Sequence, residues 1–317
     1  MTSVSGAPLV SGEETPARPT GRESVLAVTG LLVVTASWGS TFFLIKDLVT
    51  RVPVPDFLAL RFAVATAALA LVAWPAVRRL SAGARLRGVV LGLLYGLAQI
   101  LQTEGLAHTA ASVSGFVTGM YVVLTPVFAG LLLRHRIGVP ALCATGLATA
   151  GLAVLSLRGF AFGHGELLTL ASAALYALHI VALGAWTNQR DALGLSVVQV
   201  AVISCVCALA ALPGGITVPS RGDDWLALLY MALMAGAFAL VTQTWAQAHL
   251  SPTRSAVIMC AEPVWAALFA VVFGGEQVTL RMVAGGGLIL TAMYTSELGN
   301  SRPQRDAQPS RSAPSET

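Results

Sequence analysis

Long apolar runs, separated by short polar turns, occupy the chain from about residue 25 to residue 297. A helix needs about 20 apolar residues to cross a bilayer core of about 30 Å. The runs have this length and lack the strict alternation of the shorter strands of a membrane barrel. The pattern therefore predicts an all-α polytopic membrane protein with ten transmembrane helices. We expect these helices near residues 25–45, 56–77, 87–107, 112–133, 138–157, 166–186, 195–212, 225–247, 254–273 and 279–297.

The composition agrees with this pattern and excludes a soluble globular protein. Hydrophobic residues make up 56% of the 317 residues, charged residues make up 11%, and the mean hydropathy is +0.75. Soluble domains are about 45–50% apolar and about 25% charged. A globule of this size could not cover so much apolar side chain with so few charges, so we expect membrane lipid to solvate the protein.

The two ends of the chain differ from the apolar segments. Residues 1–23 and 299–317 are rich in Ser, Pro, Thr, Arg and Glu, which predicts disordered tails. We do not expect the first tail to be a signal peptide, because acidic residues precede an apolar run of full spanning length. These acidic residues are Glu13, Glu14 and Glu23.

Arginine placement predicts the side of the membrane on which the tails lie. With both tails in the cytoplasm, that side carries thirteen basic residues, including Arg78 and Arg79, and the far side carries five, including Lys46. An even number of crossings also places both tails on one side. We therefore expect a multi-pass protein of the cytoplasmic membrane with both termini cytoplasmic.

The chain contains an internal repeat. Residues 102–109 align with 243–250, sharing a Gln-Thr start and a later histidine, and residues 125–129 align with 262–266, sharing Pro-Val. Each copy holds five spans, and an odd number requires the second copy to enter the membrane with opposite polarity. The predicted repeats are residues 24–160 and 161–298, flanked by the two tails.

Inverted repeats of this kind place a binding site near the membrane midplane, where rocking of one half against the other alternately exposes it. The duplication therefore favours a secondary transporter that moves a small molecule by alternating access. An intramembrane enzyme and a membrane receptor are the alternatives. For an enzyme, the sequence lacks an H-E-x-x-H or G-x-S-x-G motif, and for an ATP-driven pump it lacks a P-loop.

Five short motifs follow one another along the chain: Trp38-Gly39-Ser40-Thr41-Phe42, Leu60-Arg61-Phe62, Tyr121-Val122-Val123-Leu124-Thr125-Pro126, Glu262-Pro263-Val264 and Gly275-Glu276. In this order and spacing they resemble those of drug/metabolite transporters of the EamA type. One turn departs from the family pattern, because Arg134-His135-Arg136 stands where family members often have Gly-Glu or Arg-Glu. The resemblance implies ten helices and transport of small metabolites, often export of amino acids or related compounds, with drug-like compounds as a further option.

Glu262 is the sharpest candidate for a functional residue, because a charged group inside hydrocarbon is costly and needs a reason. It could bind a proton or a cation during transport, or its carboxyl could merely stabilise the kink at Pro263. Pro126 and Pro263 stand at matching points of the two halves, where a helix break could line the pathway or form an ordinary packed kink.

Polar and aromatic side chains inside the spans complete the predicted substrate pathway. Gln102 and Gln243 are equivalent in the repeat, and amides could contact a polar substrate or bond between helices. Tyr176 and His179 share a helix face. The full set of predicted pathway residues is Trp38, Gln99, Gln102, Tyr121, Tyr176, His179, Gln243 and Glu262.

Three further features complete the prediction. Arg61 is expected to extend outward to the membrane surface in a structural role. Gly88, Gly92 and Gly96 form a small face on the third span that should allow close approach of a neighbouring helix, or of a second copy in a homodimer instead of a monomer. Neither a cofactor, a metal site nor a nucleic-acid partner is expected, because the four cysteines lack metal-ligand spacing and basic residues are scattered.

Overall fold

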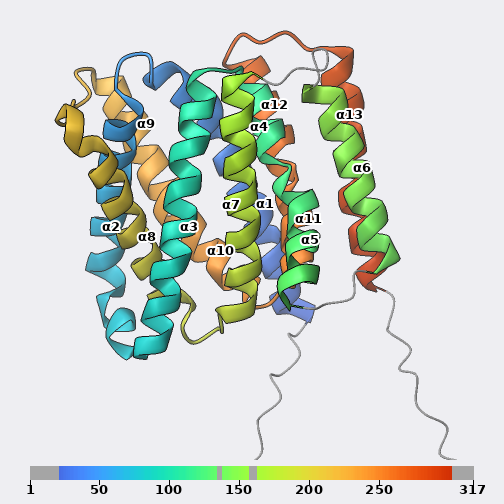
Figure 1. Cartoon of the computed structure of the whole chain (residues 1–317), viewed down its shortest axis with the longest axis horizontal. Coiled ribbons are helices and arrows are strands. Elements are labelled where there is room, and N and C mark those ends of the chain that lie inside the picture. The colour runs from blue at the N-terminus through green and yellow to red at the C-terminus, as the bar shows by residue number, and fades with distance from the viewer. Residues whose placement is uncertain (1–20, 134–137, 157–162, 302–317) are drawn as a thin grey trace, which may run out of the picture.

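The computed structural model describes residues 21–133, 138–156 and 163–301, and this part of the chain is helical without strands. The helices stand roughly parallel to one another in a bundle (Figure 1). Their order is α1 (Gly21–Leu48), α2 (Val54–Arg79), α3 (Ala82–Ala107), α4 (Ala111–Thr118), α5 (Tyr121–Leu133), α6 (Val139–Ser156), α7 (His164–Trp186), α8 (Ala192–Ala211), η1 (Leu212–Gly214), α9 (Gly222–Ala232), η2 (Leu233–Phe238), α10 (Ala239–Gln247), α11 (Pro252–Met259), α12 (Ala261–Val272) and α13 (Leu280–Ser301).

Every one of the ten expected segments is helical, and eight are long and apolar enough to cross a membrane. The two other segments contain shorter apolar stretches, Leu142–Gly151 in α6 and Leu280–Ala292 in α13. The all-helical membrane class is thus confirmed. Most of the two predicted tails, and the turn at residues 134–136, lie outside the described residues. Residues 21–23 and 299–301, expected in the tails, instead extend α1 and α13.

Local sequence explains where several helices begin. The Ser81 hydroxyl accepts a hydrogen bond from the backbone N–H of Ala84 at 3.1 Å, and Ser251 accepts one from Arg254 at 3.3 Å. Such N-caps satisfy donors that the first helical turn leaves free. Pro252 follows Ser251 at the first helical position, where the missing N–H costs nothing.

Three of the expected membrane segments are irregular within their length. The segment 112–133 breaks at residues 119–120 between α4 and α5, and the segment 254–273 breaks at Cys260 between α11 and α12. The segment 225–247 passes through a π-helix, η2, in which the small residues Ala235, Gly236 and Ala237 are buried. A π-helix departs from the regular backbone ladder and is frequent at functional sites.

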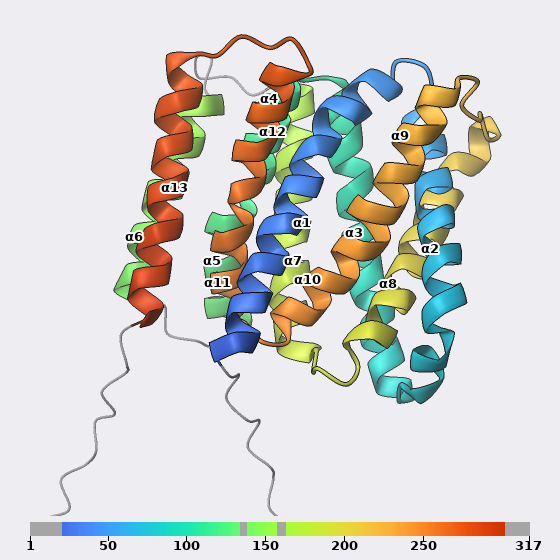
Figure 2. The same cartoon turned by 180° about the vertical axis from the view of Figure 1, so that it is seen from behind.

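Helices from the two halves of the sequence pack against one another in the bundle. α2 packs on α8, α3 packs on α7 and α8, and α1 packs on α12 and α10. α6 and α13 pack on each other and form a pair at one side of the bundle, as the two opposite views show (Figure 2). The start of α1 and the end of α13 lie at the same end of the molecule.

The glycine face of α3 contacts α8, as the sequence predicts for neighbouring helices of one chain. A Cβ atom added to Gly92 would lie 2.7 Å from Cβ of Val202 and 2.9 Å from the carbonyl oxygen of Gln199. Gly88 and Gly96 face α8 in the same way. The absence of side chains at these positions therefore sets the distance between the two helices.

Charged residues link helices at the end opposite the start of α1. Arg51, in the loop after α1, forms ion pairs with Asp47 at 2.6 Å and with Asp224 of α9 at 2.6 Å. These hydrogen bonds, first to Asp47 and then to Asp224, raise the pKa of Arg51 above its ordinary value, so the guanidinium stays charged. Lys46 donates at 3.0 Å to the carbonyls of Leu106 and Ala107 at the end of α3.

Candidate functional site

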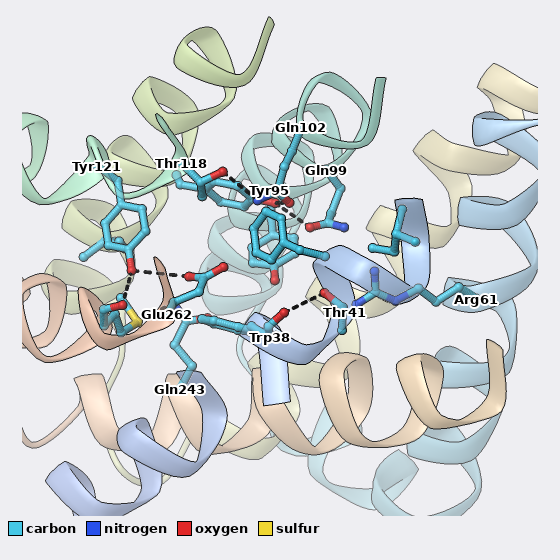
Figure 3. Close-up of a pocket in the computed structure, with 15 residues that line it drawn as sticks. Trp38, Thr41, Arg61, Tyr95, Gln99, Gln102, Thr118, Tyr121, Gln243 and Glu262 are labelled. Carbon is cyan, nitrogen blue, oxygen red and sulfur yellow. Dashed lines mark hydrogen bonds between the residues drawn. The ribbon is translucent and has the colours of Figure 1, made fainter. Parts of the chain in front are cut away.

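A small cavity lies inside the bundle, where helices from both halves of the chain meet (Figure 3). Its volume is about 40 Å³, enough for one or two water molecules. The lining combines aromatic, amide and hydroxyl side chains with one buried carboxyl and one buried guanidinium. The lining residues are Trp38, Thr41, Phe42, Ile45, Arg61, Tyr95, Gln99, Gln102, Thr118, Tyr121, Tyr176, Ile180, Gln243, Met259 and Glu262.

Helical periodicity explains how two helices each present several of these residues. Residues three, four or seven positions apart share one face of an α-helix. On α3 the lining residues are Tyr95, Gln99 and Gln102, and on α7 they are Tyr176 and Ile180. Each of these two helices therefore presents one edge to the cavity.

A hydrogen-bond network joins one wall of the cavity. The Tyr176 hydroxyl bonds to the side-chain oxygen of Gln99 and lies 3.0 Å from Oε1 of Gln102. Gln102 in turn donates from Nε2 to the Thr118 hydroxyl of α4 at 3.0 Å. The network fixes both amides without involving charge, so this wall presents oriented dipoles to the cavity.

Glu262 lies on another side, at the break between α11 and α12. Glu262 is 5% exposed, and the Tyr121 hydroxyl donates to the carbonyl of Met259 at 2.7 Å and lies within hydrogen-bonding distance of Oε2 of Glu262, at 3.4 Å. Pro263 lacks the N–H that would otherwise bond to the Met259 carbonyl in a regular helix. The proline thus leaves free the carbonyl that anchors Tyr121 beside Glu262.

The π-helix organises a third side of the cavity. The carbonyl of Ala235 accepts a hydrogen bond from Nε1 of Trp38 at 2.9 Å, and the carbonyl of Met231 accepts one from Nε of Arg61 at 3.2 Å. These carbonyls lie on α9 and η2, whereas Trp38 and Arg61 lie on α1 and α2. The irregular backbone of the eighth span therefore positions side chains from two other helices.

Seven of the eight predicted pathway residues line the cavity, namely Trp38, Gln99, Gln102, Tyr121, Tyr176, Gln243 and Glu262. His179 does not: its Nε2 lies 2.8 Å from Oε1 of Gln199 on α8, and its ring packs edge-on against Tyr95. Pro126 and Pro263 do not line the cavity either, although Pro263 leaves free the Met259 carbonyl to which Tyr121 bonds. The structure thus brings together side chains from repeat-equivalent spans and separates His179 from them.

The prediction that Arg61 extends outward to the membrane surface is wrong. Its side chain is 3% exposed and turned into the bundle, and it lines the cavity instead of reaching the membrane surface. The carbonyls of Met231 in α9 and Ala235 in η2 hold it there, and no sequence pattern had indicated these contacts. Tyr95 was also missed, because a tyrosine within an apolar span gives no signal of its own.

Two larger hollows lie beside the loop that follows α12, with volumes of about 820 and 540 Å³. Both are lined in part by Glu276 and lie between α4 and neighbouring segments at one end of the bundle. We assign the functional site to the central cavity because it gathers buried polar groups from both halves. Within the described residues, no group of three or more His, Cys, Asp or Glu could hold a metal ion.

A multi-pass helical bundle of apolar helices, with buried polar side chains around a central cavity, defines an integral membrane protein. Comparison with known proteins specifies the class. The sequence model of the EamA-like transporter family matches residues 25–157 and, a second time, residues 163–296. The chain belongs to this family.

Two relatives and one solved structure illustrate the similarity. A protein named "Uncharacterized transporter" from Archaeoglobus fulgidus is 28% identical over 281 residues, which are 88% of each chain. A "Probable terminal-alkyne amino-acid exporter" from Streptantibioticus cattleyicolor is 29% identical over 102 residues, which are 31% of this chain and 33% of the relative. A structure titled "Crystal structure of protein" aligns with TM-score 0.68 and 21% identity over 89% of this chain and 98% of that one, a likeness of fold.

Proposed function

We propose that the protein is a secondary transporter that moves a small metabolite across the cytoplasmic membrane by alternating access. The observation that carries this proposal is the central cavity, whose polar lining comes from helices of both sequence halves. The family and the names of its relatives support membrane transport of small molecules. The mechanism, the substrate and the direction are our proposal.

The packing of the helices supports two inverted five-helix repeats, residues 24–160 and 161–298. If α1 corresponds to α7, α2 to α8, α3 to α9–α10 and α5 to α12, a contact between two helices should recur between their equivalents. Two contacts do so: α3 packs on α7 as α10 packs on α1, and α5 packs on α7 as α12 packs on α1. Equivalent helices also pair with each other, α2 with α8 and α6 with α13. The repeats would require ten crossings, with α6 and α13 completing each set.

The size of the cavity fits a protein that must change shape. Ligand sites usually measure about 300–1,000 Å³, whereas this cavity measures about 40 Å³. A metabolite would therefore enter only after the two halves move apart on one side. Rocking of inverted repeats around a fixed central site supplies that movement.

The substrate we propose is an amino acid or a related compound, with a drug-like molecule as a further option, and the direction is export. The printed name of the relative from Streptantibioticus cattleyicolor supports an amino acid, over the third of its length that aligns. We further propose that Glu262 binds the coupling proton, since it is a buried carboxyl bonded to an uncharged tyrosine.

Purified protein in liposomes tests the proposal. A panel of radiolabelled amino acids, nucleosides and cationic drugs is loaded outside or inside the vesicles, and a proton gradient is imposed. We expect at least one solute to accumulate against its concentration in the presence of the gradient, and to be recovered chemically unchanged. A chemically altered product would favour the intramembrane enzyme, and binding without flux would favour the receptor.

A further inference from the structure

The cavity holds a buried guanidinium and a buried carboxyl that do not pair with each other. Among the described lining residues, Arg61 is the only basic side chain and Glu262 the only acidic one. Figure 3 shows them approaching the cavity from different sides, with Trp38 and Thr41 between them. No ion pair joins either group to another side chain in the described part of the chain. A buried guanidinium without a counterion is costly, so Arg61 needs an anion to neutralise it.

Arg61 is held firmly but not neutralised. Its Nε donates to the carbonyl of Met231 at 3.2 Å and one terminal nitrogen donates to that of Ala235 at 3.5 Å. Its guanidinium carbon lies 5.1 Å from the ring centre of Phe62 and 6.0 Å from that of Phe57. Carbonyl dipoles and aromatic rings orient a guanidinium, but none of these partners carries the full negative charge of a carboxylate.

One terminal nitrogen of the guanidinium has no hydrogen-bond partner. Nη1 of Arg61 is buried and makes no hydrogen bond, although an arginine always carries its N–H donors. A buried donor left without an acceptor costs free energy that a bound acceptor would recover. Since Arg61 lines the cavity, an acceptor in the cavity can satisfy this nitrogen.

We propose that Arg61 forms the carboxylate-binding subsite of the transported solute, an inference that rests on the proposed transport function. The solute carboxylate accepts a charge-assisted hydrogen bond from Nη1, while the carbonyls of Met231 in α9 and Ala235 in η2 hold the guanidinium through its other nitrogens. The remainder of the solute extends past Trp38 toward Glu262. This arrangement selects small molecules that carry one carboxylate.

The carboxyl of Glu262 further restricts the charges that a ligand can carry. A phosphate or a dicarboxylate would bring a second negative charge near Glu262, on a side of the cavity where no described lining residue is basic, whereas a purely cationic compound would be repelled by Arg61. A zwitterion avoids both costs, because its carboxylate meets Arg61 while its ammonium group faces the Glu262 side. The charge pattern therefore favours zwitterionic amino acids over cationic drugs.

Binding to the detergent-purified full chain tests this subsite without requiring transport. The probes are the proteinogenic amino acids, their amides, which lack the carboxylate, and the corresponding decarboxylated amines. Binding is measured as a shift of the thermal unfolding temperature over a concentration series. We expect at least one amino acid to bind about tenfold or more tightly than its amide and amine, the factor that one hydrogen bond to a charged group supplies. Equal binding of acid and amide, or no binding by any acid, would overturn the proposal.

Variants test whether Arg61 causes the tighter binding of the acid over its amide. In Arg61→Lys we expect a reduced preference for the acid, because lysine keeps the charge but loses the planar fork. In Arg61→Gln the acid and the amide should bind alike. Arg51→Gln is the matched control, since Arg51 pairs with Asp47 and Asp224 outside the cavity, and it should keep the wild-type preference. A full preference in Arg61→Gln would contradict the assignment. If that variant does not fold, the wild-type comparison of acid with amide still decides.

Flux measurements separate this inference from the proposed function. If acids bind in preference to amides but no solute crosses the liposome membrane, the transport proposal fails and the carboxylate subsite stands. If solutes are transported with equal affinity for acid and amide, transport stands and the subsite fails.

Discussion

At the scale of single residues, the environment of Glu262 decides what the carboxyl can do. A surface carboxylate is solvated, but Glu262 is buried and has a single side-chain partner, the Tyr121 hydroxyl at 3.4 Å. A carboxylate in such a place needs a cation beside it or a bound proton that neutralises it. Since Tyr121 comes from α5 and Glu262 from α12, proton binding at this point would alter a contact between the two halves.

We expect Glu262→Gln to uncouple transport from the proton gradient. Glutamine keeps the size and the hydrogen-bonding capacity of the side chain but cannot gain or lose a proton. Accumulation against a concentration gradient should disappear, whereas exchange of labelled for unlabelled solute should persist. Flux into liposomes, measured with and without a pH difference, checks both parts.

Glu104→Gln provides the control for this experiment. Glu104 is half-buried in α3 and does not line the cavity, so the same change there should leave gradient-driven flux as in the wild type. Gradient-driven accumulation that is unchanged in a folded Glu262→Gln protein would remove proton coupling through this residue.

At the scale of the helices, close packing depends on positions without side chains. Gly92→Ala would place a methyl group 2.7 Å from Cβ of Val202 and 2.9 Å from a backbone oxygen of α8. The backbone cannot yield locally, so we expect α3 and α8 to separate at a cost of about 1–3 kcal/mol. The unfolding temperature in detergent should fall by several degrees.

Gly146→Ala, on an exposed face of α6, is the matched substitution in open space. A Cβ atom at Gly146 has no heavy atom within 4 Å, apart from the glycine's sequence neighbours and its own helix backbone. Alanine also favours the helix over glycine by about 1 kcal/mol. Its unfolding temperature should therefore stay level or rise. Equal losses in both variants would mean that the α3–α8 approach does not limit stability.

The helices also mark how far the sequence could predict this molecule. Hydropathy located all ten helical segments, because spanning length and apolar content are local properties. The repeat and the polar residues within spans predicted seven of the fifteen residues that line the cavity. His179 lies outside this lining because helix position alone does not determine which neighbour a face meets, and α8 supplies Gln199 as its partner. The inward direction of Arg61 was not predicted because the backbone carbonyls that bind it, in α9 and η2, leave no recognisable sequence pattern.

At the scale of the whole molecule, the location of the tails cannot by itself establish the inverted repeat. If α6 and α13 both failed to cross the membrane, eight crossings would remain, and the two tails would still lie on one side. The halves would then hold four spans each and would have the same polarity. The difference appears in the loops of the second half, whose sides of the membrane would be reversed.

Three exposed positions at helix ends therefore decide the architecture. Thr50 follows α1, Asn188 follows α7 and Asp223 lies in the first turn of α9. With ten crossings and cytoplasmic tails, Thr50→Cys and Asp223→Cys should react with an impermeant thiol reagent in intact cells, and Asn188→Cys only after permeabilisation. The arrangement in Figure 1 supports this expectation, because the loop after α7 lies at the same end of the bundle as the start of α1. Replacing the four native cysteines first removes background labelling. With eight crossings, Asn188→Cys would react in intact cells and Asp223→Cys would be protected. The two halves would then be parallel, and rocking of inverted repeats could not be the mechanism.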